Sequence, residues 1–368
     1  MDKKLIIFDF FGVVSTEVAP QWFRRYFPPE EADRRKAALC APADRGDIDE
    51  TEYFCRLGIL TGEEPGQVMA DWLALAEMNR PLLPLLAQLR ANCPVALLSN
   101  APAGYLHRVL SREHLYSAFD TMIISSEVHM VKPDPAIYRL LLERQGVAPE
   151  EAVMVDDNPG NLQGAAEAGI DGILYTGVPQ LLEALTPFVP ALAEPGEAVL
   201  CVPNVCHAAE IAAYRQELLD ADSNMDGCGS LRRQESPLDW LDDCQRLHRP
   251  DTVPEGWVPS TQYVYVRKSD GRLLGMIQLR WELNDYLTYA GHIGYSVRPS
   301  ERRKGYAAAM LRALLPLCKA GGLDRVLLSC EVGNEASRRT ILACGGVYHS
   351  TVTEPREGRA LERYWIAL

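Results

Sequence analysis

Short apolar runs followed by polar residues recur along the first half of the chain. Four of them are Leu5–Phe8, Val95–Leu98, Thr121–Ile124 and Ala152–Val155. Runs of this length and composition are typical of strands buried on both faces of a parallel sheet. The later runs are each followed by helical periodicity, as a doubly wound α/β domain requires. Because ligands in such folds bind beyond the carboxyl ends of the strands, we expect the polar residues after these runs to share one crevice.

The long region between the first two runs contains no strong strand. Its alternation of polar and apolar positions instead favours helices, which we expect at Gln21–Tyr26, Pro29–Cys40, Asp49–Leu57 and Gly66–Met78. The sequence therefore predicts a helical insert at about residues 15–87 within the α/β domain.

A different order of elements begins after Pro187–Gly196, a segment with three prolines and a terminal glycine. The pattern beyond it predicts an α+β domain with a mixed, mostly antiparallel sheet. Its helices are expected at His207–Asp220, Pro237–Leu247, Gly305–Lys319 and Asn334–Ala343, and its strands at Thr261–Arg267, Arg272–Glu282, Ala290–Val297, Val326–Cys330 and Arg363–Leu368, with a hairpin turn at Lys268–Gly271. We expect a first domain at residues 1–190, a linker at 191–197 and a second domain at 198–368.

Charge divides the chain in the same way. Of its 37 Lys and Arg and 50 Asp and Glu residues, positions 1–195 hold 16 and 28, so nearly all of the net charge of −13 lies in the first half. This balance argues against a general nucleic-acid-binding surface. Hydrophobic residues make up 47% of the chain, which excludes a largely disordered protein.

The N-terminus and the cysteines indicate the cellular compartment of the protein. Met1–Lys4 leads into a short apolar stretch interrupted by Asp9, so we expect neither a secretory signal nor a membrane span. The ten cysteines contain no CxxC pair, and we expect reduced, mostly buried thiols rather than disulfides or a zinc site. These features predict a cytoplasmic protein.

Four polar motifs stand at the predicted strand ends of the first half: Asp9 with Gly12 close behind, Ser99-Asn100, Lys132-Pro133 and Asp156-Asp157. Each alone has a plain structural interpretation, such as a turn or a loop. In this fixed order they resemble the haloacid dehalogenase superfamily of aspartyl-nucleophile hydrolases. The resemblance covers about residues 1–190 and implies a Rossmann-like fold with a small helical cap.

By this resemblance, the phosphoryl group is handled by four residues. Asp9 acts as the nucleophile and forms an aspartyl-phosphate, while Ser99 and Asn100 bind phosphoryl oxygens. Lys132 offsets negative charge between the nucleophile and the phosphate. Phosphoryl transfer needs such a nucleophile, a cation and fixed donors.

The same resemblance implies a Mg²⁺ site. Its ligands are Asp9, Asp156 and Asp157, together with the backbone carbonyl of Phe11. Family phosphatases carry a second aspartate at the position of Phe11, where it serves as general acid and base. Loss of such a group typically costs about 10²–10⁴-fold in rate. Two alternatives therefore stay open: weak or substrate-assisted hydrolysis, or a catalytically silent domain that binds a phosphometabolite and regulates its neighbour.

The segment Val297–Ala307 follows a predicted strand and opens a predicted helix. A glycine-containing turn at a helix N-terminus is an anion site suited to a pyrophosphate. The spacing Arg302-x-x-Gly305-x-Ala307 resembles the acyl-CoA loop of the GNAT superfamily of N-acetyltransferases, and the match extends over about residues 198–368. It implies that acetyl-CoA is bound by Val297, Arg302, Arg303, Lys304, Gly305, Tyr306, Ala307 and Asn334.

Acyl transfer to an amine also needs a base for the ammonium and an acid for the thiolate. The base candidates are Glu282, at the end of one predicted strand, and His292, at the start of the next; a structural role is an equal alternative for each. Many relatives place the acid at a tyrosine where this chain has Ile341, and Tyr348 or Tyr364 could replace it.

Together these features predict a bifunctional protein with a Mg²⁺-dependent phosphatase-type domain and an acetyl-CoA-dependent N-acetyltransferase domain. The expected partners are small molecules, namely an amine and a phosphoester. We expect no nucleic acid and no membrane as partners, and the sequence is compatible with an oligomer.

Overall fold

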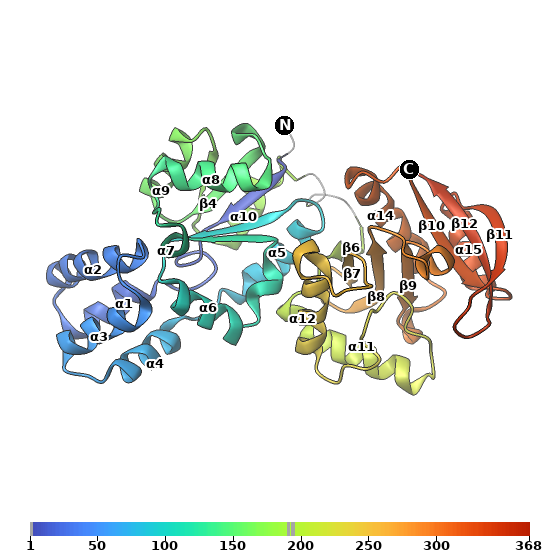
Figure 1. Ribbon diagram of the computed structural model, residues 1–368, viewed down its shortest axis with the longest axis horizontal. Coiled ribbons are helices and arrows are strands. Elements are labelled where there is room, and N and C mark those ends of the chain that lie inside the picture. Colours follow the sequence, from blue (N-terminus) through green and yellow to red (C-terminus); the bar gives the residue numbers. More distant parts are fainter. Residues whose placement is uncertain (1–2, 190–191, 193–195) are drawn as a thin grey trace. The chain divides into compact units, whose positions relative to one another are not determined.

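The computed structural model describes residues 3–189, 192 and 196–368 and divides the chain into two compact units, Met1–Glu194 and Pro195–Leu368. Figure 1 labels their elements. The expected linker at 191–197 lies largely outside the described residues. No helix in the described part of the chain combines the length and the apolar character needed to cross a membrane.

The first unit is built on a five-stranded parallel sheet with the order β3-β2-β1-β4-β5. Its strands are β1 (Leu5–Phe8), β2 (Val95–Ser99), β3 (Thr121–Ile124), β4 (Ala152–Asp156) and β5 (Asp171–Leu174). The four predicted strands are confirmed. The fifth, β5, was not predicted because only one of its four residues is buried, so it lacks an apolar run.

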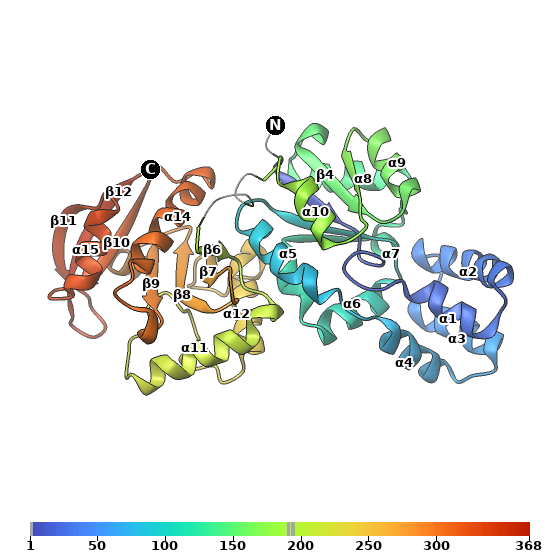
Figure 2. The same ribbon diagram turned by 180° about the vertical axis from the view of Figure 1, so that it is seen from behind.

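Helices cover both faces of this sheet, and α1 to α4 form a separate group, drawn in blue in Figure 1 and seen from behind in Figure 2. On one face, alternate strand residues such as Leu5 and Ile7 pack with Ile137 of α8 and Ala165 of α9. The helices of the first unit are α1 (Val18–Tyr26), α2 (Pro29–Asp44), α3 (Glu50–Thr61), α4 (Pro65–Leu75), α5 (Leu83–Arg90), α6 (Ala103–Arg112), α7 (Ser125–Val128), α8 (Pro135–Gln145), α9 (Pro159–Glu167) and α10 (Val178–Leu185).

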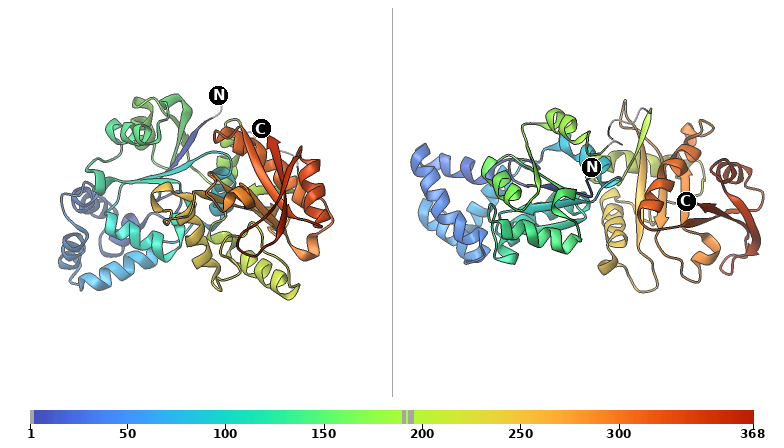
Figure 3. Two further views of the ribbon diagram at one scale, coloured as in Figure 1. Left: turned by 45° about the vertical axis from the view of Figure 1, so that its right-hand side comes forward. Right: turned by 90° about the horizontal axis from the view of Figure 1, so that it is seen from above.

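The second unit contains two antiparallel sheets, with the orders β6-β7-β8-β9 and β10-β12-β11. Both views in Figure 3 show β10 to β12, in red, as a sheet of their own. The strands are β6 (Ala198–Cys201), β7 (Ser260–Arg267), β8 (Leu273–Arg280), β9 (Ile293–Val297), β10 (Arg325–Glu331), β11 (Val347–Thr353) and β12 (Ala360–Ala367). The helices are α11 (Ala208–Asp220), α12 (Pro237–His248), α13 (Leu287–Ala290), α14 (Tyr306–Ala320) and α15 (Glu335–Ala343).

Three predicted strand boundaries in this unit were wrong. One is the start of the last strand, since β12 begins at Ala360, three residues before the predicted Arg363. The predicted strand Arg272–Glu282 ends at Arg280, which pairs with the first residue of β7. The Trp281 N–H still donates to the Pro259 carbonyl at 2.9 Å, but proline has no N–H with which to continue the ladder. The predicted strand Ala290–Val297 starts only at Ile293, because Leu287–Ala290 form the short helix α13. Strands β6 and β11 were not predicted, and β11 is largely exposed.

Candidate functional sites

The parallel pairing of β1 with β4 brings Asp9, the nucleophile candidate, close to Asp156. Phe8 of β1 pairs with Val155 of β4, so Asp9 and Asp156 follow at the same edge of the sheet. The Nζ atom of Lys132 lies 2.8 Å from Oδ1 of Asp9 and 2.8 Å from Oδ2 of Asp156. All three side chains are buried. One ammonium thus joins two carboxylates at the carboxyl ends of the two strands.

The charges in this cluster are unequal. The pKa of the Asp9 carboxyl is raised to about 7, chiefly by burial, with Lys132 opposing the rise and Asp156 adding to it. Burial lowers the pKa of Lys132, but the two carboxylates outweigh it and the net shift is upward. The pair is asymmetric because the cation faces two anions, whereas Asp9 faces one cation and one anion. Lys132 is therefore charged at neutral pH, and Asp9 is close to its titration point.

The oxygens of Asp9, Asp156 and Asp157 could hold a metal ion, since one ligand atom from each lies within 4.8 Å of the others. Three carboxylates at this spacing fit a hard divalent cation such as Mg²⁺. Gly12 makes room for Asp157, because a Cβ atom at Gly12 (φ +88°) would lie 2.2 Å from its Oδ2. Asn161, to which the sequence analysis gave no role, donates through Nδ2 to both oxygens of Asp156 at 3.1 Å.

The two phosphate-binding candidates differ in what they offer. The Oγ atom of Ser99 is fully buried at the end of β2 and has no hydrogen-bond partner among the described residues, which suits an oxygen ligand. Asn100 instead holds the Lys132 loop: its Nδ2 donates to the Lys132 carbonyl at 2.8 Å and its Oδ1 accepts from the Lys132 N–H at 2.9 Å.

Phe11 belongs to an aromatic cluster with the helical group. Its ring stacks on Tyr105 with a centroid distance of 6.1 Å, and Tyr105 in turn contacts Phe54 of α3 and Trp72 of α4. The side chain at this position is thus used for packing.

In the second unit, strands β9 and β10 meet at one end and then separate. Gly291 and Leu328 form an isolated bridge, and the N–H of Leu327 donates to Nδ1 of His292 at 2.9 Å. The His292 N–H donates in return to the Leu327 carbonyl at 2.8 Å, so His292 is bound to β10 at the end where the two strands meet. His292 is buried and is accordingly a neutral acceptor, since burial lowers its pKa.

The separation of the strands opens a cavity of about 1130 Å³. Its lining includes all of β9, the end of β10 and the start of α15. Of the eight predicted cofactor residues, seven line it: Val297, Arg302, Arg303, Gly305, Tyr306, Ala307 and Asn334. Lys304 is not among the lining residues, and neither base candidate is. Glu282 is an exposed residue beyond the end of β8.

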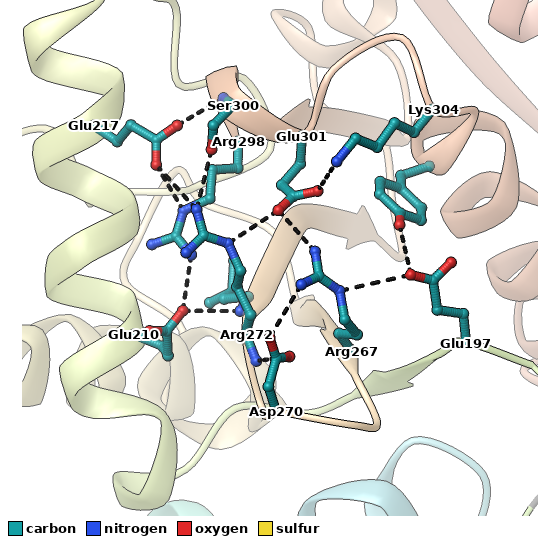
Figure 4. A network of polar contacts seen from close by, with 12 residues as sticks. Glu197, Glu210, Glu217, Arg267, Asp270, Arg272, Arg298, Ser300, Glu301 and Lys304 are labelled. Atoms are coloured by element: carbon teal, nitrogen blue, oxygen red, sulfur yellow. Dashed lines mark hydrogen bonds and ion pairs between the residues drawn. The ribbon is translucent and has the colours of Figure 1, made fainter.

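A network of ion pairs supports the loop before α14 (Figure 4). Glu301 is buried and receives three cations: Arg267 at 2.7 Å, Arg272 at 3.0 Å and Lys304 at 2.7 Å. Hydrogen bonds from these groups hold the pKa of Glu301 down at about 2, with Lys304 the largest contributor. The ammonium of Lys304 is thus directed toward Glu301. The acidic residue inside the run Ser300–Lys304 is the sequence feature that indicates this pairing.

Arg298 continues this network beneath the loop. Its guanidinium is almost fully buried and pairs with Glu210 at 2.8 Å and Glu217 at 3.0 Å, both on α11. Glu217 also accepts from the Ser300 N–H at 2.7 Å. The loop that opens α14 is therefore fixed to α11 from below, with Arg303 (φ +68°) and Gly305 (φ +85°) in the left-handed region.

Comparisons with known proteins agree with both parts of this description. Residues 3–169 match the haloacid dehalogenase-like hydrolase family, and residues 228–345 match the acetyltransferase (GNAT) family. A phosphoserine phosphatase of Thermus thermophilus is 40% identical over 85 residues, which is 23% of this chain and 34% of that protein. The chain spans about a third of the length of the first curated relatives it matches.

Solved structures also resemble the chain. A haloacid dehalogenase family enzyme of Bacteroides thetaiotaomicron is 23% identical, with a TM-score of 0.42, and covers 47% of this chain and 93% of its own. The ribosomal-protein-S5-alanine acetyltransferase of Vibrio fischeri is 17% identical, with a TM-score of 0.38, and covers 47% of this chain and 94% of its own.

Proposed function

The chain carries a haloacid dehalogenase-like hydrolase domain at residues 3–169 and a GNAT acetyltransferase domain at residues 228–345, and we propose that it is a bifunctional enzyme. The first domain is a Mg²⁺-dependent phosphatase-type hydrolase, and the second transfers the acetyl group of acetyl-CoA to a small-molecule amine. We place the domains at residues 1–190 and 198–368, with a linker at 191–197.

The observation that carries the hydrolase proposal is the buried Lys132 ammonium shared by Asp9 and Asp156 at 2.8 Å. Asp9 attacks the phosphorus and forms an aspartyl-phosphate, while the leaving alkoxide departs with the electron pair of the broken bond. Lys132 balances the charge of the transferred group, and Ser99 Oγ donates to one of its oxygens. A bound Mg²⁺ would be held by Asp9, Asp156 and Asp157 and would offset phosphoryl charge.

The Phe11 side chain has no proton to give to the leaving group. Hydrolysis is therefore slow, or it depends on a proton from the substrate itself. Asp9→Asn should abolish turnover on a broad phosphoester panel, whereas Asp134→Asn, an exposed helix-capping carboxylate outside the site, should leave it unchanged. Equal turnover in the wild type and Asp9→Asn would refute the nucleophile assignment.

A second role for this domain is favoured by Phe11, whose ring packs on Tyr105 where a phosphatase would need a carboxylate. Here the domain binds a phosphometabolite without turnover and regulates the acetyltransferase. Beryllofluoride with Mg²⁺ mimics an aspartyl-phosphate. A change in acetylation kinetics on its addition, without phosphatase activity, would favour this role.

The acetyltransferase proposal is carried by the cavity between β9 and β10 and the loop that closes one end of it. Backbone N–H groups at the start of α14 and the Arg303 side chain face the space where an anionic cofactor would lie. Gly305→Ala should weaken acetyl-CoA binding, measured by calorimetry. Gly322→Ala is the matched control, because Gly322 also has a positive φ, of +92°, and does not line the cavity. Equal loss in both variants would contradict the assignment.

The general base is open to a kinetic test. Glu282 and His292 remain candidates, but both lie outside the cavity lining, while Asp226 and Glu331 are carboxylates that belong to it. Removal of the general base must change the pH dependence of kcat/KM. We propose that Glu282→Gln and His292→Ala leave that profile unchanged and that Asp226→Asn or Glu331→Gln alters it.

A further inference from the structure

Three arginines of the cavity have no carboxylate within ion-pair distance among the described residues, and two of them, Arg280 and Arg303, lie at different ends of β9. Among the described lining residues, Arg302 is bound to the Val297 carbonyl, and Arg359 and Arg339 are paired with glutamates. Arg303 is free on the loop that follows the carboxyl end of β9. Arg280 lies at the other end without a carboxylate partner, and its backbone N–H donates to the carbonyl of His292.

The distance between these two places follows from strand geometry. Strand β9 has five residues, and a strand rises about 3.3 Å per residue, so the Cα atoms of its two ends lie roughly 13 Å apart. A cofactor whose phosphates meet the loop at Arg303 would extend its pantetheine arm along β9 and present the acetyl group near the start of the strand. Arg280 therefore lies where the acetyl group would meet its acceptor.

The guanidinium of Arg280 is poorly satisfied. Its Nη1 atom donates to the Gly291 carbonyl at 3.1 Å, and no carboxylate oxygen in the described ranges lies within 4.0 Å of it. Burial lowers its pKa, so the charge is costly where it stands. Four of the five N–H donors of a guanidinium remain for a ligand, in the planar arrangement that suits carboxylate and phosphate oxygens.

The surroundings keep this place open. Gly294 of β9 lies beside the guanidinium, since a Cβ atom there would lie 3.5 Å from Nη2 of Arg280. Asp226 lines the same cavity and interacts electrostatically with Arg280 without coming within ion-pair distance. An unpaired cation and an unpaired carboxylate thus face one space.

We propose that Arg280 binds an anionic group of the acceptor, so that the substrate is a small amine that also carries a carboxylate or a phosphate. Asp226 attracts the ammonium end of the same molecule. This inference rests on the proposed acetyltransferase function and narrows its substrate class. Polyamines carry only positive charge and have no anionic group to pair with Arg280. By this reasoning they are poor substrates.

The test uses the full chain with bound CoA and four probes of similar size. β-Alanine carries a carboxylate, O-phosphoethanolamine a phosphate, and ethanolamine and β-alaninamide carry no anion. Calorimetry should show binding of one or both amines that carry an anionic group at least about 10-fold tighter than the two that carry none, as expected for a charge-assisted bidentate contact. The stronger of the two anionic probes identifies the group. Equal binding of the amines with and without an anionic group would overturn the proposal.

Substitution of Arg280 completes the test. Arg280→Met should abolish the preference for the anionic amine while the Kd of acetyl-CoA stays unchanged, and Arg280→Lys should retain part of it. Arg339→Met is the control, because Arg339 lines the same cavity but is exposed. A preference that survives in Arg280→Met would overturn the proposal. Failure of the proposed function itself would look different: acetyl-CoA would not bind, and mass spectrometry would find no acetylated amine.

Discussion

Removal of the proposed nucleophile should stabilise the first domain. Burial raises the pKa of Asp9 from its usual 3.8 to about 7, so the folded state holds a proton that the unfolded state releases. Stability is therefore lost as pH rises through the window from about 4 to 7. One pKa unit corresponds to about 1.4 kcal/mol, which puts the full cost near 4 kcal/mol above pH 7.

Asp9→Asn removes this cost but also one partner of Lys132, so we expect a net gain of about 1–3 kcal/mol at pH 7.5 without divalent cations. Lys132→Met removes the cation from beside two buried carboxylates and should cost about 3 kcal/mol. The two substitutions each remove one charge from the same contact, and they change the stability of the first unit in opposite directions.

The assay must isolate the first unit, because the chain has two units and one melting temperature would mix them. Hydrogen exchange is measured on the full chain in the presence of EDTA and followed in peptides from β1 and β4, where it reports local unfolding of these strands. Saturating Mg²⁺ should then stabilise the wild type by about 2.7 kcal/mol at 100 times its Kd, and Asp9→Asn by less. The account of the cluster's electrostatics would be refuted by two results in EDTA: protection from hydrogen exchange that is lowered by Asp9→Asn, and protection that is unchanged by Lys132→Met.

Three further substitutions test the two sites. Gly12→Ala should destabilise the first unit and weaken Mg²⁺ binding, since its Cβ would lie 2.2 Å from Asp157 Oδ2; unchanged Mg²⁺ calorimetry would count against the metal site. Glu301→Gln should raise the Kd of acetyl-CoA about 5-fold by loosening the loop, whereas the exposed control Glu255→Gln should leave the Kd unchanged. Tighter binding of acetyl-CoA by Glu301→Gln would show that Glu301 only repels an anion. Gly227→Ala should also weaken acetyl-CoA binding, since its Cβ would lie 2.1 Å from a carbonyl of β9.

Local sequence was sufficient for the elements whose burial is uniform. Strands β1 and β4 are buried at every position, so their apolar runs are unbroken and their ends could be located. The same pattern failed for β5 and β11, which are mostly exposed and carry mixed residues. Edge strands are specified by backbone pairing with a neighbour, and that pairing leaves little trace in composition.

The candidate sites show the same division. Carboxylates at two strand ends were visible in the sequence, because a parallel sheet brings its carboxyl ends together whatever lies between them. The sharing of one Lys132 ammonium by Asp9 and Asp156 depended on where the loop bearing Lys132 comes to rest, with Asn100 holding it. Sequence spacing contains no information on that position.

For the second domain, the sequence by itself determined the class of fold and the loop that could bind an anion. Only the tertiary structure decided which charges are free to act. Lys304 looks like a cofactor ligand in the sequence but is paired with Glu301, and His292 looks like a base but accepts a hydrogen bond from the backbone of β10. Arg280, at the end of an apolar strand, gave no signal at all. Whether a charged side chain is paired depends on neighbours distant in the chain, and folding alone brings those neighbours into contact.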